Sequence, residues 1–316
     1  MFGLQLLQRV ARITGLYDVA ARAYLQLLAK RHDTDFSIEE KNGVRVVSLR
    51  RGHRVLKAAA RHFAYCADLI RFFDYYFDAV EPKQSGSDFV VDYSAPHEHV
   101  LKGNGLSFYF SSFAEPCATT DLYLQYAGLN KGDVVFDLGA YCGSSAQAFS
   151  HAVGSSGRVF AFEPDQENYA ALLRNIDDHQ MTNVVPIQKG IWSSETTLEF
   201  QSEGNMGSSV SGLLARSGHT RRVSVTSISA AAMEHKIDRL DLIKMDIEGA
   251  EVEALPAAAD VLARFSPTLI IESHRRNGHL TTEAVCRFLS GSGYVCEVIP
   301  QGELDLPLIH AAPANR

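Results

Sequence analysis

Short apolar runs alternate with amphipathic segments along the second half of the chain. The amphipathic segments repeat apolar residues at helical spacing over 144–153, 167–179 and 281–293. Apolar runs of strand length lie at 133–139, 158–164, 183–188, 268–274, 294–299 and 305–310, and one at 241–255 continues into a helix. Strands that alternate with helices predict a doubly wound, mostly parallel α/β sheet.

The first 112 residues have a less regular pattern. Apolar residues at helical spacing predict helices within 6–28 and 56–80. The segment 43–52, which is bounded by glycines, predicts a strand, and 81–88 has the composition of a loop. Two further segments, 89–94 and 106–113, resemble the strands of a hairpin-like lid.

These patterns predict two parts of the chain. Residues 1–112 are expected to form a mainly helical segment with short strands, which acts as a lid, contacts an acceptor or builds an oligomer interface such as a homodimer. Residues 113–316 are expected to form the catalytic domain.

The residues that end the strands carry the candidate chemistry, because ligands of such sheets bind outside the carboxyl ends of the strands. The first strand of the regular part ends at Asp137, and Gly139 and Gly143 follow it. Glycines let a ligand approach the main chain, and the next helix offers its amides. The second strand ends at Glu163, about 20 residues after Gly143. At that spacing an acid meets the ribose hydroxyls of an adenosine cofactor.

The acid before the first glycine separates two kinds of cofactor. A dinucleotide site shows G-x-G-x-x-G and holds phosphates, which Asp137 would repel. The same acid suits the amine and the sulfonium of S-adenosylmethionine, which has no phosphate. A tight strand–helix turn with a capping acid is the alternative interpretation of Asp137 alone.

A second group of ionisable residues follows two later strands. Lys244, Asp246, Glu248 and Glu251 surround Gly249. A helix start explains Glu248 and Glu251, since acids favour a first turn, but it explains Lys244 and Asp246 less well. The next strand ends with Glu272 and His274, and a single histidine is as often structural as catalytic.

Four stretches resemble the FkbM-type methyltransferases, in the order of that family: VVFDLGAYCG, FAFEPDQENYAALLRNI, DLIKMDIEGAEVEAL and PTLIIESH. The resemblance runs from about Ala114 to the C-terminus, and only Tyr141-Cys142 departs from the usual motif. It implies a Rossmann-like class I fold and S-adenosylmethionine-dependent O-methylation of a sugar, glycolipid, polysaccharide or macrolide-like acceptor. The expected cofactor contacts are Asp137, Gly139, Ala140, Tyr141, Gly143, Glu163, Pro164, Asn168, Gly190, Ile191 and Asp246.

The expected catalytic residues are Asp246, Glu248, Glu272 and His274. A sugar hydroxyl needs a base within hydrogen-bond reach, and the ordinary pKa of histidine suits that task. Asp246 is expected to face the methionine end of the cofactor and Glu248 the acceptor. No metal is expected, although a Mg²⁺ ion held by two acids is an alternative. The base could also come from the polar and basic segment 205–222 or from the N-terminal segment.

Composition excludes some classes of function. The 316 residues carry a net charge of −7, which argues against a nucleic-acid partner. A nucleic-acid methyltransferase stays an alternative, which only the basic segment 50–63 supports. A non-catalytic binding protein on the same fold is the other alternative. We expect a cytoplasmic protein, because its five cysteines are scattered and no signal peptide or membrane span is visible. The basic N-terminal helix could contact a membrane surface, or pack on the domain or a partner.

Overall fold

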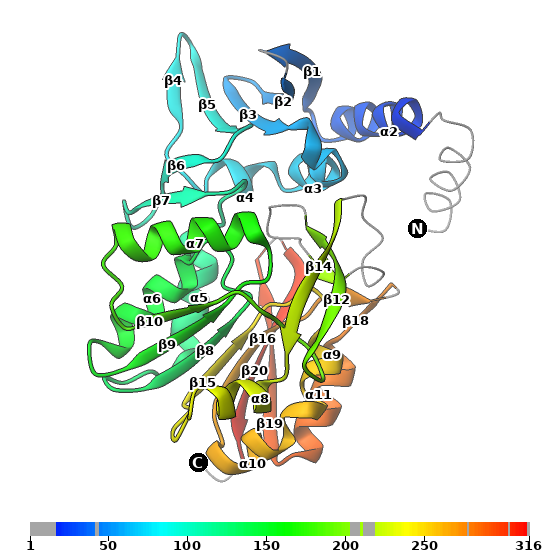
Figure 1. Ribbon diagram of the computed structural model, residues 1–316. Helices are drawn as coiled ribbons and strands as arrows, with labels where there is room; N and C mark the ends of the chain where they lie inside the picture. Colours follow the sequence, from blue (N-terminus) through cyan, green and yellow to red (C-terminus); the bar gives the residue numbers. More distant parts are fainter. Residues whose placement is uncertain are drawn as a thin grey trace. The chain divides into compact units, whose positions relative to one another are not determined.

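The computed structural model describes residues 17–41, 44–202, 209–210, 219–276, 278–302 and 304–314. The chain divides into two compact units, of which the first ends at Ala95 and the second begins at Pro96. Each unit contains a sheet of its own (Figure 1). The division therefore lies before the boundary expected at residue 113.

The first unit is built on a five-stranded sheet in the order β1-β2-β3-β5-β4. Strands β3 and β5 are parallel, and the other neighbours are antiparallel. Its elements are α2 (Tyr17–Arg31), β1 (Asp35–Lys41), β2 (Val44–Arg51), β3 (Arg54–Ala59), η1 (Ala60–Tyr65), α3 (Cys66–Arg71), α4 (Phe73–Phe77), β4 (Lys83–Ser85) and β5 (Asp88–Tyr93). Leu49, Leu56 and Phe73 are fully buried and belong to its core.

The structure confirms some of the elements expected in this unit and corrects others. Strand β2 confirms the strand expected at 43–52. The helix expected from residue 56 is wrong up to Ala59, because β3 pairs with β2 there through a two-residue turn. The turn contains Gly52 at a φ of 57°, which suits a tight hairpin. The expected loop 81–88 contains β4, and the expected N-terminal helix is described only from Tyr17 on.

The expected pairing of 89–94 with 106–113 is also wrong. Strand β5 pairs with β3 and β4, whereas β7 (Ser107–Phe110) pairs with β6 (His97–Val100) in the second unit. The β6–β7 hairpin packs on α7 (Gln166–Asp178). The Asn175 side chain accepts from Tyr109 N and donates to Tyr109 O, both at 2.8 Å. These contacts explain why the second unit begins before residue 113.

The second unit contains the sheet that the sequence predicts. Its order is β10-β9-β8-β15-β16-β20-β19, and the first five strands are parallel. Strand β20 runs antiparallel to both of its neighbours. The strands are β8 (Val134–Leu138), β9 (Arg158–Phe162), β10 (Val184–Ile187), β15 (Leu242–Met245), β16 (Thr268–Glu272), β19 (Tyr294–Gln301) and β20 (Leu304–Pro313). The doubly wound, mostly parallel sheet is therefore confirmed.

Helices cover both faces of this sheet and enclose two cores (Figure 1). Because side chains alternate along β8, Val135 packs with Phe149 on one face, and Phe136 packs with Leu262 on the other. The remaining helices are α5 (Cys117–Ala127), α6 (Ser144–Val153), α8 (Ile228–Glu234), α9 (Glu251–Ala254), η2 (Pro256–Ala258), α10 (Ala259–Phe265) and α11 (Thr282–Gly291).

A small sheet between β10 and α8 was not expected from the sequence. It has the order β11-β14-β12-β13. Its strands are β11 (Gly190–Ile191), β12 (Thr196–Ser202), β13 (Ser209–Val210) and β14 (His219–Thr226). Strands β17 (Arg275–Arg276) and β18 (His279–Leu280) form a separate pair. Of the polar segment 205–222, residues 205–208 and 211–218 lie outside the described residues.

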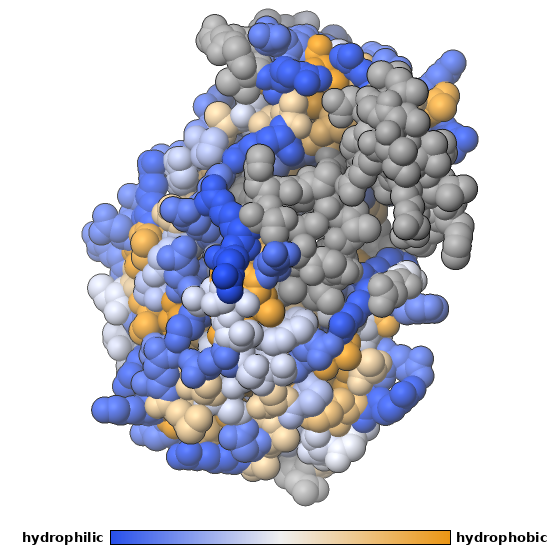
Figure 2. Space-filling model, turned by 45° about the vertical axis from the view of Figure 1, so that its right-hand side comes forward, coloured by the Kyte–Doolittle hydropathy of each residue, from blue (hydrophilic) through white to orange (hydrophobic). Residues whose placement is uncertain are grey.

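Exposed apolar side chains occur on several elements of the described part of the chain. Large apolar side chains that are exposed, such as Leu173, Met233 and Val295, lie on three different elements. In Figure 2 apolar residues on the visible face are interspersed with hydrophilic ones, which is ordinary for a protein surface. A membrane-spanning helix needs about 20 apolar residues, and no helix in the described part of the chain meets that requirement.

Candidate active site

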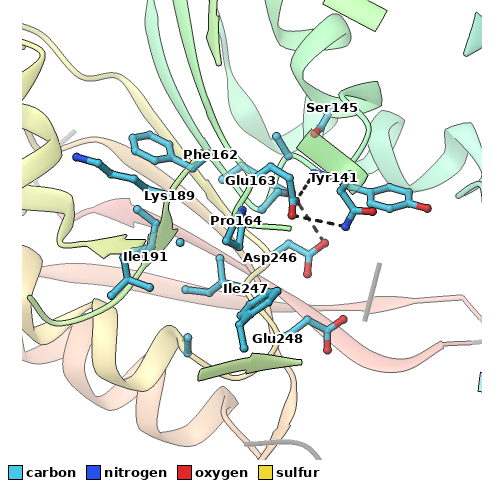
Figure 3. Close-up of a pocket in the computed structure, with 18 of the residues that line it drawn as sticks. Tyr141, Ser145, Phe162, Glu163, Pro164, Lys189, Ile191, Asp246, Ile247 and Glu248 are labelled. Atoms are coloured by element: carbon cyan, nitrogen blue, oxygen red, sulfur yellow. Dashed lines mark hydrogen bonds and ion pairs between the residues drawn. The ribbon is translucent and has the colours of Figure 1, made fainter. Parts of the chain in front are cut away.

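A cleft lies at the carboxyl ends of β8, β9 and β15 (Figure 3). Nine of the expected cofactor residues line it: Gly139, Ala140, Tyr141, Glu163, Pro164, Asn168, Gly190, Ile191 and Asp246. Of the expected catalytic residues, Asp246 and Glu248 line the cleft. Glu272 and His274 lie behind Asp246 and are not part of the wall.

Asp137 differs from the expectation that it faces the methionine end of the cofactor. Its side chain is fully buried and does not line the cleft. One carboxylate oxygen accepts from Ser145 Oγ at 2.7 Å, and the other lies 3.3 Å from Lys244 Nζ. Lys244 also donates to Gly139 O at 2.7 Å. Asp137 therefore fixes the loop below the cleft through Lys244, which explains an ionised lysine on an apolar strand.

The two glycines after β8 are required by the packing of the protein itself. Gly139 has a φ of 82°, and a Cβ atom there would lie 1.8 Å from Asp246 O. Gly143 begins α6 with a φ of 93°, and its Cβ would lie 2.7 Å from Leu172 Cδ1. The bare backbone thus lets β8 and β15 end side by side, and Gly139 also leaves the cleft floor open.

Glu163 is held in the cleft wall by main-chain groups (Figure 3). Its Oε2 accepts from Tyr141 N at 3.0 Å, and its Oε1 accepts from Asp165 N at 2.8 Å. Burial and then the charge of Asp165 raise the pKa of Glu163 to about 8, although these hydrogen bonds oppose the shift. The carboxyl group is therefore positioned by the backbone before any ligand arrives.

Two residues of the wall have strained backbones. Tyr141 and Glu248 have φ values of 49° and 55°, in the left-handed region that residues other than glycine rarely adopt. The other described residues of this kind, Asp33, Gln180, Lys236 and Ser266, follow the last turns of helices, where such a conformation is common. Strain outside a helix end concentrates at functional sites, and both residues face this cleft.

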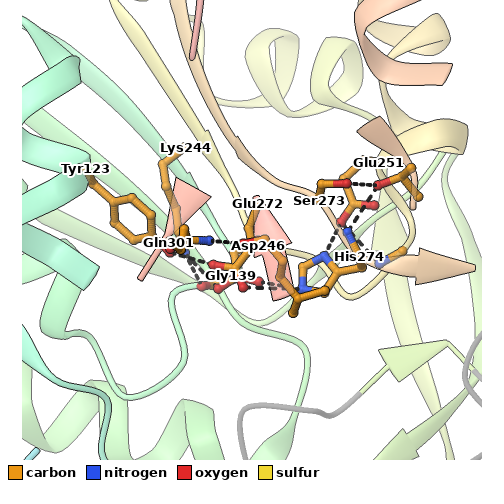
Figure 4. A network of polar contacts seen from close by, with 12 residues as sticks. Tyr123, Gly139, Lys244, Asp246, Glu251, Glu272, Ser273, His274 and Gln301 are labelled. Atoms are coloured by element: carbon orange, nitrogen blue, oxygen red, sulfur yellow. Dashed lines mark hydrogen bonds and ion pairs between the residues drawn. The ribbon is translucent and has the colours of Figure 1, made fainter. Parts of the chain in front are cut away.

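Behind the wall, His274 lies between two carboxylates (Figure 4). Its Nδ1 is 2.9 Å from Glu251 Oε1, and its Nε2 is 3.3 Å from Asp246 Oδ1. Glu251 is fully buried and also accepts from Gly249 N at 3.1 Å. Glu251 is thus more than a helix start, because it fixes the orientation of the imidazole ring that holds Asp246.

The surroundings of His274 bear on the role expected for it, because they shift its pKa. Burial lowers the pKa of His274, but the charges of Glu248 and Glu251 and the hydrogen bonds of Asp246 and Glu251 outweigh it, so the pKa lies well above its ordinary value. The surrounding carboxylates thus stabilise the protonated imidazole, a form that has no free nitrogen to accept a proton. Burial raises the pKa of Asp246, but Lys244 and His274 reverse the effect, and the net shift is downward.

Glu272 is the third acid of this network. Its Oε2 accepts from Tyr123 OH at 3.2 Å, and its Oε1 lies 3.9 Å from His274 Nε2. Burial and then the charge of Asp246 raise the pKa of Glu272 to about 7. Lys244 completes the network from the other side, 3.9 Å from Asp246 Oδ2 and 5.5 Å from the centre of the Tyr123 ring.

Asp246, Glu272 and His274 are also close enough to be considered as metal ligands. Each offers one ligand atom, and these atoms lie within 4.8 Å of one another. A metal-binding imidazole must be neutral, however, and the carboxylates around His274 favour its protonated form. We therefore interpret the group as a network that shares protons, and metal dependence stays a question for experiment.

Several wall residues were missed from the sequence. They are Glu115, Tyr123, Ser144, Ser145, Phe162, Lys189, Phe200, Val225, Lys244, Ile247 and Ala250. Glu115 and Tyr123 precede the first strand of the parallel sheet, where no strand-end pattern points to them. Phe200 and Val225 come from the unexpected sheet. Lys244 stood out in the sequence as an ionised residue on an apolar strand, but it was not expected among the cofactor or catalytic residues.

A comparison with known families settles which group of proteins this chain belongs to. A model of the methyltransferase FkbM domain matches residues 137–296, just over half of the chain. The chain belongs to the FkbM methyltransferase family. The membership confirms the resemblance, and the matched residues lie in the unit that contains the mostly parallel sheet.

Relatives with curated descriptions cover part of this FkbM protein. It is 25% identical over 142 residues to the hexuronic acid methyltransferase AglP of Haloferax volcanii, which is 45% of this chain and 56% of AglP. It is 29% identical over 83 residues to TRM61 of Yarrowia lipolytica, the catalytic subunit of a tRNA (adenine(58)-N(1))-methyltransferase. The matched residues make up 26% of this chain and 21% of TRM61. The chain thus spans about half of AglP and about a fifth of TRM61.

A solved structure of the same family is also similar. The crystal structure of a methyltransferase FkbM from Methylobacillus flagellatus KT matches with a TM-score of 0.48 and 15% identity. The match covers 94% of this chain and 59% of that chain.

Proposed function

We propose that this protein transfers the methyl group of S-adenosylmethionine to a hydroxyl group of a sugar-containing acceptor. The observation that carries the proposal is the position of Glu163. It places a buried carboxyl group in the cleft wall, beside the glycine turn and at the end of the neighbouring parallel strand. A carboxylate there can accept hydrogen bonds from both hydroxyls of a ribose.

The wall fits the other parts of S-adenosylmethionine as well. Phe162, Ile191 and Val225 form an apolar region next to Glu163, which suits an adenine ring. The main chain at Gly139 and Ala140 is open to the methionine part, because these residues have little or no side chain. Bound in this way, the cofactor would supply a methyl group on a positively charged sulfur.

The opposite side of the cleft is rich in carboxyl groups. Glu115, Asp246 and Glu248 line it, and Tyr123 lies next to them. Carboxylates accept hydrogen bonds from hydroxyls and can take a proton from one, so this side suits a polyhydroxylated acceptor. The partial match to AglP, whose name describes methylation of a hexuronic acid, supports a sugar acceptor.

A nucleic-acid acceptor has weaker support. The match to TRM61 covers about a quarter of the chain, and a net charge of −7 is unfavourable for phosphate backbones. Within the first unit, the basic residues Arg50, Arg51 and Arg54 form ion pairs with Asp74, Asp78 and Asp88. Those pairs compete with any contact to phosphates.

Transfer of a labelled methyl group tests this function. The protein is incubated with S-[methyl-³H]adenosylmethionine and either an oligosaccharide panel, with neutral and uronic sugars, or total tRNA. We expect label in an oligosaccharide, as an ether that survives mild alkali, and none in tRNA. Label in tRNA alone would contradict the proposal. Asp246→Asn serves as the inactive control, and the exposed Asp238→Asn serves as its active counterpart.

A further inference from the structure

Glu115 lies in the wall of the same cleft but has no role in the contacts described so far. It precedes α5, and Tyr123 of that helix lines the cleft beside it. We propose that Glu115 accepts the proton of the acceptor hydroxyl during methyl transfer. This inference rests on the proposed function, because it names the base of that reaction.

The first argument is that the other carboxyl groups of the site already have partners. Asp246 is paired with His274, Glu272 accepts from Tyr123, and Glu163 accepts from two main-chain amides. Within the described residues, no hydrogen bond or ion pair engages the Glu115 carboxyl group. It is half-buried and remains available to a hydroxyl group that enters the cleft.

The second argument comes from the charges that face Glu115. Glu115 is surrounded by the negative charges of Asp246, Glu272 and Glu248, and Lys244 contributes a positive charge. Burial has the largest effect and these acids add to it, so the pKa of Glu115 rises to about 8, against the opposing effect of Lys244. A base with a pKa near the working pH is effective, because it ionises readily and still binds the transferred proton.

The same geometry couples the base to the methyl donor. A cation bound in the cleft favours the ionised form of any nearby carboxyl group, so the sulfonium of S-adenosylmethionine should lower the pKa of Glu115. S-adenosylhomocysteine has a neutral sulfur and should not do so. Glu115 would therefore lose its proton when the methyl donor binds and would regain a proton from the acceptor.

The transfer step balances with this assignment. The hydroxyl oxygen forms a bond to the methyl carbon, the bond from carbon to the positive sulfur breaks with its electrons left on sulfur, and the hydroxyl proton moves to a carboxylate oxygen of Glu115. The products are a methyl ether, a neutral thioether and a protonated Glu115, which returns its proton to water when the next methyl donor binds.

Proton release on ligand binding tests the proposal without an acceptor. Isothermal titration at pH 8 in buffers of different ionisation enthalpy gives the number of protons released by each ligand. At this pH a carboxyl group with a pKa of about 8 is about half protonated. We expect S-adenosylmethionine to release up to about half a proton more from the wild type than from Glu115→Gln. S-adenosylhomocysteine should give no such difference.

The controls separate Glu115 from other titrating groups. Titration of the ligands themselves is the same for both proteins and cancels between them. Glu163 meets the ribose of both ligands, so it contributes to both alike. The exposed Glu283→Gln should behave as the wild type. Equal proton release from the wild type and Glu115→Gln overturns the inference, whereas failure of either ligand to bind overturns the proposed function with it.

A second variant protects the test against a general effect on folding. Glu115→Asp keeps the charge but withdraws it from the cleft by one methylene group. It should keep the proton release while losing transfer rate. With the acceptor from the labelling experiment, Glu115→Gln should lower kcat by about 100-fold or more at saturating S-adenosylmethionine. It should also weaken S-adenosylmethionine binding but not S-adenosylhomocysteine binding, because a group that the sulfonium ionises must in turn favour the sulfonium. An unchanged kcat would overturn the inference.

Discussion

The two sides of the cleft hold their carboxyl groups by different means. On one side, main-chain amides of Tyr141 and Asp165 hold Glu163. On the other side, side chains hold Asp246: His274 lies 3.3 Å and Lys244 3.9 Å away. A backbone contact depends on the fold alone, whereas a side-chain contact depends on a few particular residues. The first side should therefore tolerate substitution of its neighbours, and the second should not.

The largest expected effect concerns Lys244, which joins the loop after β8 to the end of β15. Lys244→Met leaves Asp137 fully buried with Ser145 as its remaining partner. Removal of one member of a buried ion pair costs about 3–5 kcal/mol. We expect the free energy of unfolding in urea to fall by that amount.

Two controls show whether the buried charge is the cause. Asp137→Asn combined with Lys244→Met removes the charge that has lost its partner, so it should recover part of the stability. Lys131→Met, at an exposed lysine, should change the stability by less than about 0.5 kcal/mol. A double variant as unstable as Lys244→Met would contradict the ion-pair account.

The next effect concerns the rate of transfer. Asp246→Asn keeps the shape of the side chain but removes a charge at the wall, and His274→Ala removes the group that holds it. Each should lower the single-turnover rate by at least about 100-fold at saturating cofactor. Cofactor affinity should change less than in a Glu163 variant. Near-wild-type rates for both would show that this side of the cleft is not where the reaction occurs.

The same assay with EDTA tests the absence of a metal. Because His274 is expected to be protonated between two carboxylates, the wild-type rate should not change on chelation. A loss of rate that Mg²⁺ restores would replace the proton-sharing network by a metal site at Asp246, Glu272 and His274.

The smallest effect is a dependence of ligand affinity on pH. The pKa of Glu163 is about 8, so the group is mainly protonated at pH 7 and mainly ionised at pH 9. Only the ionised form accepts hydrogen bonds from both ribose hydroxyls. Affinity for S-adenosylhomocysteine, measured by calorimetry, should therefore rise up to about tenfold from pH 7 to pH 9, relative to Glu163→Gln. A parallel pH dependence in the variant would show that another group titrates.

The two sides of the cleft also differ in how far the sequence predicts them. Gly139 and Glu163 follow apolar strands at a characteristic spacing, so a local pattern is enough to find them. Glu115 and Tyr123 lie before the parallel sheet and reach the cleft only through its folding. The role of Glu251 was missed for a similar reason, since its partner His274 is 23 residues away. Contacts between distant side chains leave no periodic signal.

The same reasoning explains the errors in the fold. The parallel strands are buried on both faces, which gives continuous apolar runs that are easy to recognise. Strand β3 alternates less clearly, and its apolar residues join the helix that follows into one apparent helical pattern. The strands β12 and β14 pair across residues that are mostly polar, so neither period stands out.

The central claim is that this cleft binds S-adenosylmethionine through Glu163. Calorimetric titration of the wild type and of Glu163→Ala tests it most directly, with circular dichroism to show that the variant is folded. Loss of one to two ribose hydrogen bonds should weaken S-adenosylmethionine by roughly tenfold to several hundredfold. Equal affinity for the two proteins, or binding of NAD in place of S-adenosylmethionine, would contradict the account.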